Sequence, residues 1–244
     1  TGHLLVVYGH LFRKFYNGKI ILHAHTTKVV NNKHKLLMPL FRVLSKNTVY
    51  TRVSCGQEAG KFCYGSSKFT IVENGIDYNS LLNQEGSQES IKFFKWLNDK
   101  LENRQILLCN VAAFTTQKNH SFLIDILHDT IKYNKNVHLL LVGSGDLQNK
   151  VKEKVDNLNL QNNVHFLGHK NDVGFILNNC DIVILPSLYE GLPVSAIEAQ
   201  ALNKLCLLSD KIDKTVVISE NTKLLSITST DPWVKNIINY NKSF

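Results

Sequence analysis

Short apolar runs alternate with helical patterns along most of this chain of 244 residues. The runs are rich in Val, Ile and Leu, which is typical of strands buried on both faces of a parallel sheet. In the second half we predict such strands near 105–111, 137–142, 163–167, 181–185 and 205–209, with a weaker one at 224–227. Helices are predicted between them at 119–133, 146–158, 172–179 and 193–202, and after them at 232–239. The alternation therefore predicts an α/β fold with a doubly wound parallel sheet.

The first third of the chain shows the same alternation with fewer strands. We predict strands at 19–23, 48–54 and 68–73, helices near 4–15, 33–46 and 56–63, and a turn at Asp77. A doubly wound domain usually has about six strands, so we expect the chain to begin inside a domain whose earlier strands are absent. Its end at Phe244 also looks early. The predicted domains are 1–82 and 104–244, joined by a linker and helix at 83–103.

The excess of positive charge lies in the first third of the chain. Residues 1–82 hold 11 Lys and Arg against 3 Asp and Glu, whereas residues 83–244 hold 17 of each, so the first segment accounts for the net charge of +8. A basic face favours an anionic partner such as the inner membrane surface, but scattered solvated lysines explain it equally well. The basic helix at 33–46 fits a membrane surface or, more often, a helix docked on a core. No aromatic residues interleave with the basic ones, so nucleic acid is not an expected partner.

The five cysteines are widely spaced and form no CxxC pair. This pattern favours reduced thiols and argues against a zinc site or a disulfide framework. The first residues lack the charged start and cleavage site of a signal peptide, and no run reaches the ~20 apolar residues of a membrane span. We therefore expect a cytoplasmic protein, with peripheral membrane contact through the basic segment as one interpretation of its charge.

The loops that follow the predicted strands form the candidate site, because doubly wound sheets bind ligands beyond the carboxyl ends of their strands. One loop, "AAFTTQKNH", brings Lys118 to a helix start, and another, "GSGD", contains Gly143 and Gly145. Two glycines let a backbone approach a ligand closely. The alternative is a tight turn in which Asp146 caps the next helix.

The run "YEGLPVSAIEAQ" joins a turn to the start of a helix. Pro193 is predicted at the first helical position, which leaves the amides of Val194 and Ser195 unpaired at the positive end of the helix dipole, a site suited to phosphate. Glu190 and Glu198 have the wrong charge for phosphate but suit the hydroxyl groups of a sugar or a ribose. Each glutamate alone would more often be a solvated surface residue. Their joint spacing favours a nucleoside-diphosphate sugar as the ligand.

These motifs together resemble the retaining glycosyltransferases of family four, which have the GT-B architecture of two Rossmann-like domains. "EGLPVSAIEA" is similar to the E-x7-E signature of that family, and "IVENGID", "QKNH", "LLLVGSGDL" and "VHFLGHKNDV" follow its pattern in order. The likeness is greatest to bacterial enzymes that assemble capsular and extracellular polysaccharide. It implies a hexosyltransferase that moves a sugar from a nucleotide donor, expected to be a UDP-sugar, to a glycan or polyprenyl-diphosphate-linked acceptor with retention.

The resemblance also implies roles for single residues. Glu190 would contact hydroxyls of the transferred sugar, Glu198 would hold the ribose hydroxyls, and Lys118 would neutralise the diphosphate. His25, in "HAHTT", matches a histidine that reaches toward the donor sugar from the acceptor domain. Backbone amides of the phosphate-binding turn would come from Gly191, Leu192 and Pro193 to Val194, where proline itself has none. No metal is expected, because basic side chains and the helix end supply the positive charge.

Two further expectations concern His25 and Ala113. His23 and His25 alternate at the end of a predicted strand, so we predict that they point in opposite directions. Where the family usually reads Gly-Arg-Phe, this chain has Ala113 in place of the arginine, and the lost phosphate contact predicts transfer slower by about 100-fold. Two alternatives therefore stand beside the transferase: an activity-impaired subunit of the same fold, and a nucleotide-sugar 2-epimerase.

Overall fold

The structure is a computed structural model that describes residues 18–25, 50–100 and 105–240, together with single positions at 12, 15, 16, 39, 42, 43 and 46. It divides into two compact units: Thr1–Gly75 with Tyr189–Leu192, and Ile76–Leu188 with Pro193–Phe244. The helices predicted near 4–15 and 33–46 lie outside the described residues, apart from a few isolated positions. The domain boundaries predicted from the sequence stay a prediction.

The first unit contains a parallel sheet of three strands in the order β1-β2-β3. Tyr64 fixes a helix to this sheet, because its hydroxyl lies 2.6 Å from Leu22 O and 3.0 Å from Val53 O and shares its one hydrogen between these two acceptors. Burial raises the pKa of that hydroxyl well above its usual range, which keeps it a donor. The elements are β1 (Ile20–Ala24), β2 (Tyr50–Ser54), α3 (Gln57–Tyr64) and β3 (Thr70–Ile71). The three predicted strands of this segment are confirmed.

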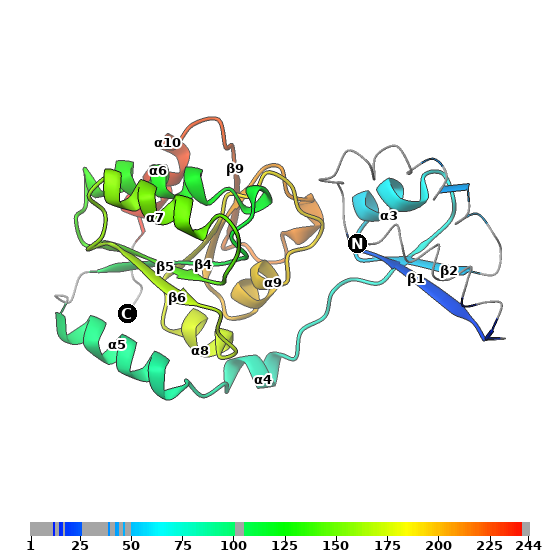
Figure 1. Cartoon of the computed structure of the whole chain (residues 1–244), viewed down its shortest axis with the longest axis horizontal. Helices are drawn as coiled ribbons and strands as arrows, with labels where there is room; N and C mark the ends of the chain where they lie inside the picture. The colour runs from blue at the N-terminus through cyan, green and yellow to red at the C-terminus, as the bar shows by residue number, and fades with distance from the viewer. Residues whose placement is uncertain are drawn as a thin grey trace. The chain divides into compact units, whose positions relative to one another are not determined.

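The second unit is built on a parallel sheet of six strands in the order β6-β5-β4-β7-β8-β9 (Figure 1). β4 comes first in the chain and lies at the centre; β5 and β6 follow on one side, and β7, β8 and β9 on the other. This is the strand order of the doubly wound fold. The strands are β4 (Ile106–Val111), β5 (Val137–Val142), β6 (Val164–Gly168), β7 (Ile182–Leu185), β8 (Leu205–Ser209) and β9 (Thr222–Leu225). The predicted fold class is confirmed, although β9 begins two residues earlier than expected.

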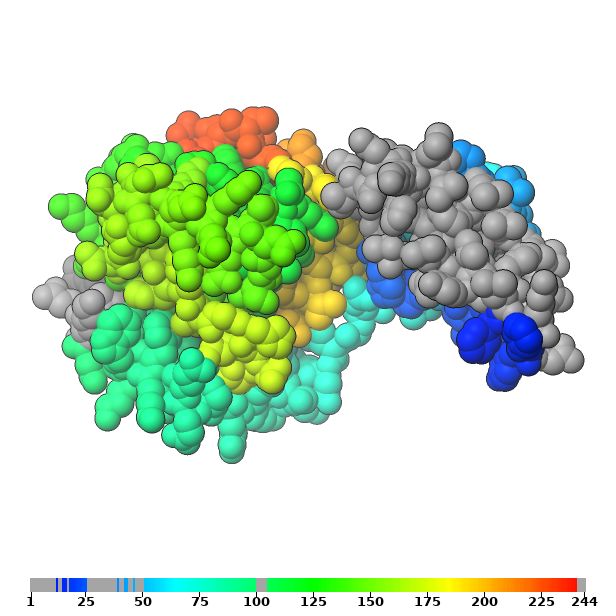
Figure 2. Space-filling model, in the orientation of Figure 1, coloured from blue at the N-terminus to red at the C-terminus, as the bar shows by residue number. Residues whose placement is uncertain are grey.

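Helices cover both faces of the six-stranded sheet (Figure 1). One face carries α6 (His120–Ile131), α7 (Gln148–Asn157) and α10 (Asp231–Ile238), and the side chains of α7 form part of the front surface in Figure 2. The other face carries α8 (Val173–Asn178) and α9 (Val194–Ala201), with α4 (Tyr78–Leu82) and α5 (Gln88–Lys100) packed beside them. Asp77, predicted as a turn residue, is the N-cap of α4 and accepts from Ser80 N at 3.0 Å. Within the described residues no helix is long and apolar enough to cross a bilayer.

The core of the second unit lies between the sheet and the layer of α6, α7 and α10. Leu108, Leu139 and Ile184, one from each of the strands β4, β5 and β7, are fully buried there. Trp233 closes the core from α10: its ring is fully buried and its Nε1 donates to Ser226 O at 2.7 Å. Burial on both faces explains why these strands are nearly continuous apolar runs.

Candidate functional site

The predicted site lies where β4 and β7 end. These two strands are neighbours in the sheet, although β5 and β6 separate them in the chain. In a doubly wound sheet the connections on the two sides of such a junction lead to opposite faces and leave a crevice for a ligand. The loop after β4 contains Lys118, and the loop after β7 begins at Pro186 and leads to α9. Because β4 and β7 are neighbours in the sheet, the two loops begin side by side at the junction between these strands.

Hydrogen bonds join these two loops. Leu188 N donates to Gln117 O at 2.8 Å, and Asn119 Nδ2 donates to Pro186 O at 3.2 Å. Asn119 has left-handed backbone angles, φ 54° and ψ 42°, which asparagine tolerates better than most residues. The bonds fix the turn that carries Lys118 against the first residues after β7.

Lys118 lies in a 3₁₀ turn, η1 (Thr116–Lys118), rather than at the start of the following helix. The predicted helix at 119–133 begins at His120, because Asn119 takes the left-handed conformation and interrupts the helical backbone. A three-residue 3₁₀ turn is too short to produce a periodic pattern in the sequence. Lys118 still follows β4 in the loop expected for it, and it is half-buried there.

Gly143 and Gly145 lie in the loop after β5, against the backbone of the loop after β4. A Cβ atom on Gly143 would lie 2.1 Å from Ala112 O, and one on Gly145 would lie 2.7 Å from Phe114 O. Phe114 N also donates to Ser144 O at 3.0 Å. The glycines therefore allow a close approach between the backbones of two neighbouring loops, which differs from the approach to a ligand that the sequence predicted. Their role in donor binding stays a prediction.

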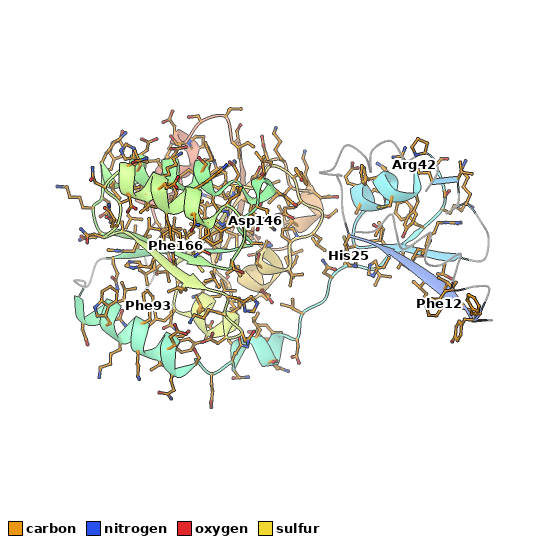
Figure 3. The ribbon with its side chains drawn as sticks, viewed as in Figure 1. Phe12, His25, Arg42, Phe93, Asp146 and Phe166 are labelled. Carbon is orange, nitrogen blue, oxygen red and sulfur yellow. The ribbon has the colours of Figure 1, made fainter. Side chains whose placement is uncertain are left out.

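In the alternative interpretation of "GSGD", the turn is present at Asp146 and Leu147, but the predicted cap by Asp146 is wrong. The next helix, α7, begins at Gln148 with Leu147 as its N-cap, and no side chain caps it. Asp146 lies before that N-cap and is exposed; Figure 3 labels it on the second unit. Asp146 and Leu147 form a turn before the helix, so Asp146 lies one position too early in the chain to be the N-cap.

We expect Gly143→Ala to destabilise the second unit by about 2–4 kcal/mol, because the new methyl group would meet backbone atoms and a φ of 138° disfavours any side chain. Gly168→Ala is the matched control. Its φ is 71°, but nothing lies within 4 Å of the Cβ position, so only a backbone cost of about 1–2 kcal/mol remains. Urea unfolding of both variants measures the difference, and equal losses would contradict the packing role of Gly143.

Helix α9 begins one residue later than predicted. Pro193 is its N-cap, with φ −67° and ψ 121°, and not its first helical residue. Because this ψ is extended, Pro193 contributes only its carbonyl to the helix, which accepts from Ala196 N at 3.1 Å and Ile197 N at 3.3 Å. The amides of Val194 and Ser195 precede these bonds, and amides at the first helical positions have no acceptor within their own helix. These two amides lie at the helix N-terminus where the sequence predicted an anion site; the binding of an anion there stays a prediction.

Glu198 lies in the second turn of α9 and is half-buried. Burial raises the pKa of its carboxyl above the ordinary value. A partly desolvated carboxyl group forms stronger hydrogen bonds than one in water, because the local dielectric constant is lower. The position thus suits recognition of hydroxyl groups, as the sequence predicted, and the ligand it would take stays a prediction.

Gln200, one of the residues that sequence reasoning missed, holds α9 in place. Its side chain is 4% exposed, and its Nε2 donates to Val216 O at 2.8 Å. Its Oε1 accepts from Ile218 N at 2.9 Å and from Thr222 Oγ1 at 2.7 Å. These bonds tie the helix that carries Glu198 to the segment between β8 and β9. The signal in the sequence was a long polar side chain among the small and apolar residues of a buried helix.

His120 is a second buried polar residue that the sequence did not single out. Its ring is 3% exposed and stacks on Phe114 with the ring centroids 4.2 Å apart. Burial, reinforced by the positive charge of Lys118, lowers its pKa to about 4. Among the described residues neither ring nitrogen has a hydrogen-bond partner. His120 is therefore a neutral imidazole that packs beneath the loop after β4.

The burial of His120 predicts a loss of stability in mild acid. Its pKa is about 4 in the folded state against 6.5 ordinarily, so the unfolded state binds the proton first and the free energy of unfolding falls as pH drops below 6.5. The fall between pH 7.5 and pH 5 should be about 2 kcal/mol from this group. Over the same pH interval, the free energy of unfolding of His120→Phe, measured with urea, should fall by about 2 kcal/mol less than that of the parent.

His169→Phe is the matched control for this experiment. His169 is an exposed imidazole directly after β6, so the control removes one histidine without removing a buried one, and the effect is expected in His120→Phe alone. A His120→Phe variant with the parent's pH dependence would contradict the assignment of the effect to the buried imidazole.

His25 and the turn at 189–192 group with the first unit. The rings of His23 and His25 lie with their centroids 3.9 Å apart, so the prediction that these side chains point in opposite directions is wrong. The physical reason is that β1 ends at Ala24, so the alternation of a strand does not extend to His25, labelled in Figure 3. Partial burial and the neighbouring His23 lower the pKa of His25.

Glu190 is half-buried beside Tyr189, while Gly191 and Leu192 are buried. Burial and the charge of Glu190 raise the pKa of Tyr189. Of the predicted site residues, the first unit therefore holds His25 and the turn at 190–192. The second unit holds the rest: Lys118, Gly143, Gly145, Pro193, Val194 and Glu198.

Comparison with known proteins identifies the family. The family model described as "Glycosyl transferases group 1" matches residues 91–237, more than half of the chain. The chain belongs to this family. The resemblance seen in the sequence is thereby confirmed, and the matched residues include both loops of the β4–β7 junction.

The curated relatives of this family member include bacterial glycosyltransferases. It is 31% identical over 205 residues to the putative glycosyltransferase EpsF of Bacillus subtilis. The aligned region covers 80% of this chain and 52% of the relative. It is 27% identical over 185 residues to the N,N'-diacetylbacillosaminyl-diphospho-undecaprenol alpha-1,3-N-acetylgalactosaminyltransferase of Campylobacter jejuni. That aligned region covers 75% of this chain and 46% of the relative. The chain thus spans about half the length of these relatives.

The crystal structure of Anabaena HepE in complex with UDP-glucose has the same fold. It superposes with a TM-score of 0.79 at 17% sequence identity and covers 97% of this chain and 66% of that one. At this identity the likeness concerns the fold alone. The GT-B architecture expected from the sequence is confirmed.

Proposed function

We propose that this chain is part of a retaining glycosyltransferase that moves a sugar from a UDP-sugar to a glycan or polyprenyl-diphosphate-linked acceptor in polysaccharide biosynthesis. The observation that carries the proposal is the bonded pair of loops at the β4–β7 junction. One of these loops carries Lys118, and the other leads to the N-terminus of α9. A cation and a helix N-terminus are the two features that bind a diphosphate without a metal.

The chemistry follows from the charge that develops during transfer. The bond between the anomeric carbon and the diphosphate oxygen breaks, and a bond to an acceptor hydroxyl forms on the same face of the sugar. The hydroxyl proton passes to the departing phosphate. Negative charge therefore grows on the diphosphate, where the Lys118 ammonium and the amides of Val194 and Ser195 would stabilise it.

The other predicted residues would position the two sugars of the donor. Glu198 would accept hydrogen bonds from the ribose hydroxyls, and Glu190 would do the same for the transferred sugar. His25 would approach the donor sugar from the acceptor side. No general acid or base is required among them, because the leaving phosphate itself accepts the proton.

Two relatives support the choice of substrates. The Campylobacter jejuni relative is by name a transferase that acts on a diphospho-undecaprenol-linked acceptor. Anabaena HepE has been solved with UDP-glucose bound. The surplus of positive charge in residues 1–82 is consistent with a lipid-linked acceptor, since it would draw the protein to an anionic membrane surface.

The ribose contact predicts a selective loss of affinity in Glu198→Gln. Losing one charged hydrogen-bond acceptor costs about 1.5–3 kcal/mol, so the Kd for UDP should rise by about 10- to 100-fold. Parent and variant should bind 2′,3′-dideoxy-UDP equally, because that nucleotide lacks both hydroxyls. Isothermal titration calorimetry on the full-length protein measures all four affinities.

Glu153→Gln is the matched control, because Glu153 is an exposed glutamate on α7. Its affinities for both nucleotides should equal those of the parent. If Glu198→Gln raised the Kd for UDP and for the dideoxy nucleotide by the same factor, Glu198 would support the helix and would not hold the ribose.

A second candidate, an activity-impaired subunit, rests on Ala113. This residue is exposed in the loop after β4, and its carbonyl accepts from Thr115 N at 2.8 Å. The exposed position has room for a longer side chain. The chain thus lacks a guanidinium at a place that can accommodate one, beside the turn that carries Lys118.

Ala113→Arg should therefore accelerate transfer by about 10- to 100-fold, because a bidentate guanidinium stabilises the diphosphate as it leaves. Ala113→Gln, of similar reach but neutral, should leave the rate near that of the parent. The measurement is acceptor-dependent release of UDP from a UDP-sugar by the full-length protein. No gain with arginine would contradict the impairment, and release of UDP without any acceptor would favour the 2-epimerase.

A further inference from the structure

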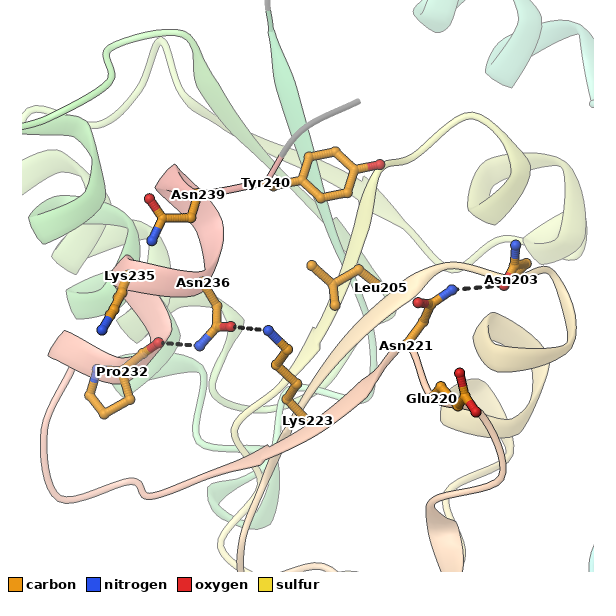
Figure 4. A pocket seen from close by; sticks show the side chains of 10 residues that line it. All are labelled: Asn203, Leu205, Glu220, Asn221, Lys223, Pro232, Lys235, Asn236, Asn239 and Tyr240. Atoms are coloured by element: carbon orange, nitrogen blue, oxygen red, sulfur yellow. Dashed lines mark hydrogen bonds between the residues drawn. The ribbon is translucent and has the colours of Figure 1, made fainter. Parts of the chain in front are cut away.

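A polar pocket lies beside β9, the outermost strand of the six-stranded sheet. It is an open pocket of ≈ 880 Å³ between β9, the start of β8 and α10 (Figure 4). Leu205 is the first residue of β8, and Glu220 and Asn221 come directly before β9. None of its described lining residues belongs to the loops after β4 and β7, and β8 lies between β9 and β7 in the sheet. It is therefore distinct from the proposed donor site.

The lining of this pocket is unusually rich in carboxamides. Four of its ten described lining residues are asparagines, at positions 203, 221, 236 and 239, and Leu205 and Pro232 are the aliphatic ones among these ten. A carboxamide both donates and accepts hydrogen bonds, and so does a sugar hydroxyl. Tyr240 adds an aromatic ring at one side of the pocket (Figure 4). Such a lining matches a ligand with many hydroxyl groups and small apolar faces.

Hydrogen bonds preorganise much of the lining (Figure 4). Asn236 Nδ2 donates to Pro232 O at 2.7 Å, and Asn236 Oδ1 accepts from Lys223 Nζ at 2.7 Å. Across the pocket Asn221 Nδ2 donates to Asn203 Oδ1 at 2.8 Å. An ammonium group has three donors, so Lys223 keeps further N–H groups for a ligand after its bond to Asn236. Side chains already held in place lose less conformational entropy on binding.

Charge is distributed unevenly within the pocket. Lys223 on β9 and Lys235 on α10 are exposed near one end, whereas Glu220 lies toward the other (Figure 4). The end with the two lysines suits a carboxylate, and the end with Asn203 and Asn221 suits hydroxyl groups. A volume of ≈ 880 Å³ lies within the range of known ligand sites and is large enough for a short oligosaccharide.

We propose that this pocket binds an acidic saccharide. Lys223 and Lys235 would hold the carboxylate of a uronic acid unit, and the asparagines would hold ring hydroxyls. Because the pocket lies away from the donor loops, it would retain a glycan chain on the protein between successive transfers. The inference extends the proposed function by naming a class of glycan, but the binding itself requires no transfer.

The test is calorimetric titration of the full-length protein with trigalacturonic acid, with maltotriose as a neutral trisaccharide and with sodium sulfate as a simple anion. We expect trigalacturonic acid to bind at least 10-fold more tightly than maltotriose, and sulfate at equal ionic strength to leave that binding unchanged. Lys235→Gln should raise the Kd for trigalacturonic acid by about 5- to 10-fold and leave the Kd for maltotriose unchanged. Lys235 is exposed on α10, so its replacement should not disturb folding.

Lys214→Gln is the matched control, because Lys214 is an exposed lysine that does not line the pocket. It should bind trigalacturonic acid as the parent does. Absence of binding at millimolar saccharide, displacement by sulfate, or equal affinities in parent and Lys235→Gln would each overturn the proposal. Titration of the same samples with UDP separates this outcome from a failure of the proposed function, which would abolish nucleotide binding and leave saccharide binding intact.

Discussion

The parallel pairing of β4 with β7 is the interaction on which the site depends. It sets Leu108 opposite Ile182 and Cys109 opposite Val183. Side chains reinforce it at both ends: Asp181 Oδ2 accepts from Leu107 N at 2.8 Å, and Asn110 Nδ2 donates to Ile184 O at 2.7 Å. With the two strands in this register, the loop that carries Lys118 and the loop that leads to α9 start at the same height and bond to each other. A different register would separate the cation from the helix end.

The loops at this junction are held by packing and buried hydrogen bonds more than by their own local structure. Glycine at position 143 lets one loop lie against the backbone of another, and Asn119 accepts a left-handed conformation to bond across the junction. Gln200 fixes α9 from its buried side. A site that stabilises developing charge benefits from such rigidity, because prepositioned charges and dipoles need no reorganisation during the reaction.

Two parts of the six-stranded sheet have different chemistry. The carboxyl ends of β4 and β7 lead to Lys118 and to a helix N-terminus, which suit phosphate. The pocket beside the outermost strand β9 presents carboxamides, two lysines and Tyr240, whose pKa is raised by burial and by the charge of Asp181. Because β8 lies between β7 and β9, one small domain has space for a nucleotide at the β4–β7 junction and for a saccharide beside β9.

The sequence by itself determined the succession of the described strands, the fold class, the family and the loops that carry the candidate residues. These features follow from local patterns: strands buried on both faces are apolar runs, and the motif around Glu190 and Glu198 is continuous in the chain. Only the tertiary structure decided that Pro193 is an N-cap, that the rings of His23 and His25 lie against each other, and that Gly143 packs on a loop. The polar pocket also became visible only in the tertiary structure, because its lining residues come from separate elements. Each of these depends on backbone angles or on partners distant in the chain, such as Asn119 and Pro186, which are 67 residues apart, and no local pattern records such contacts.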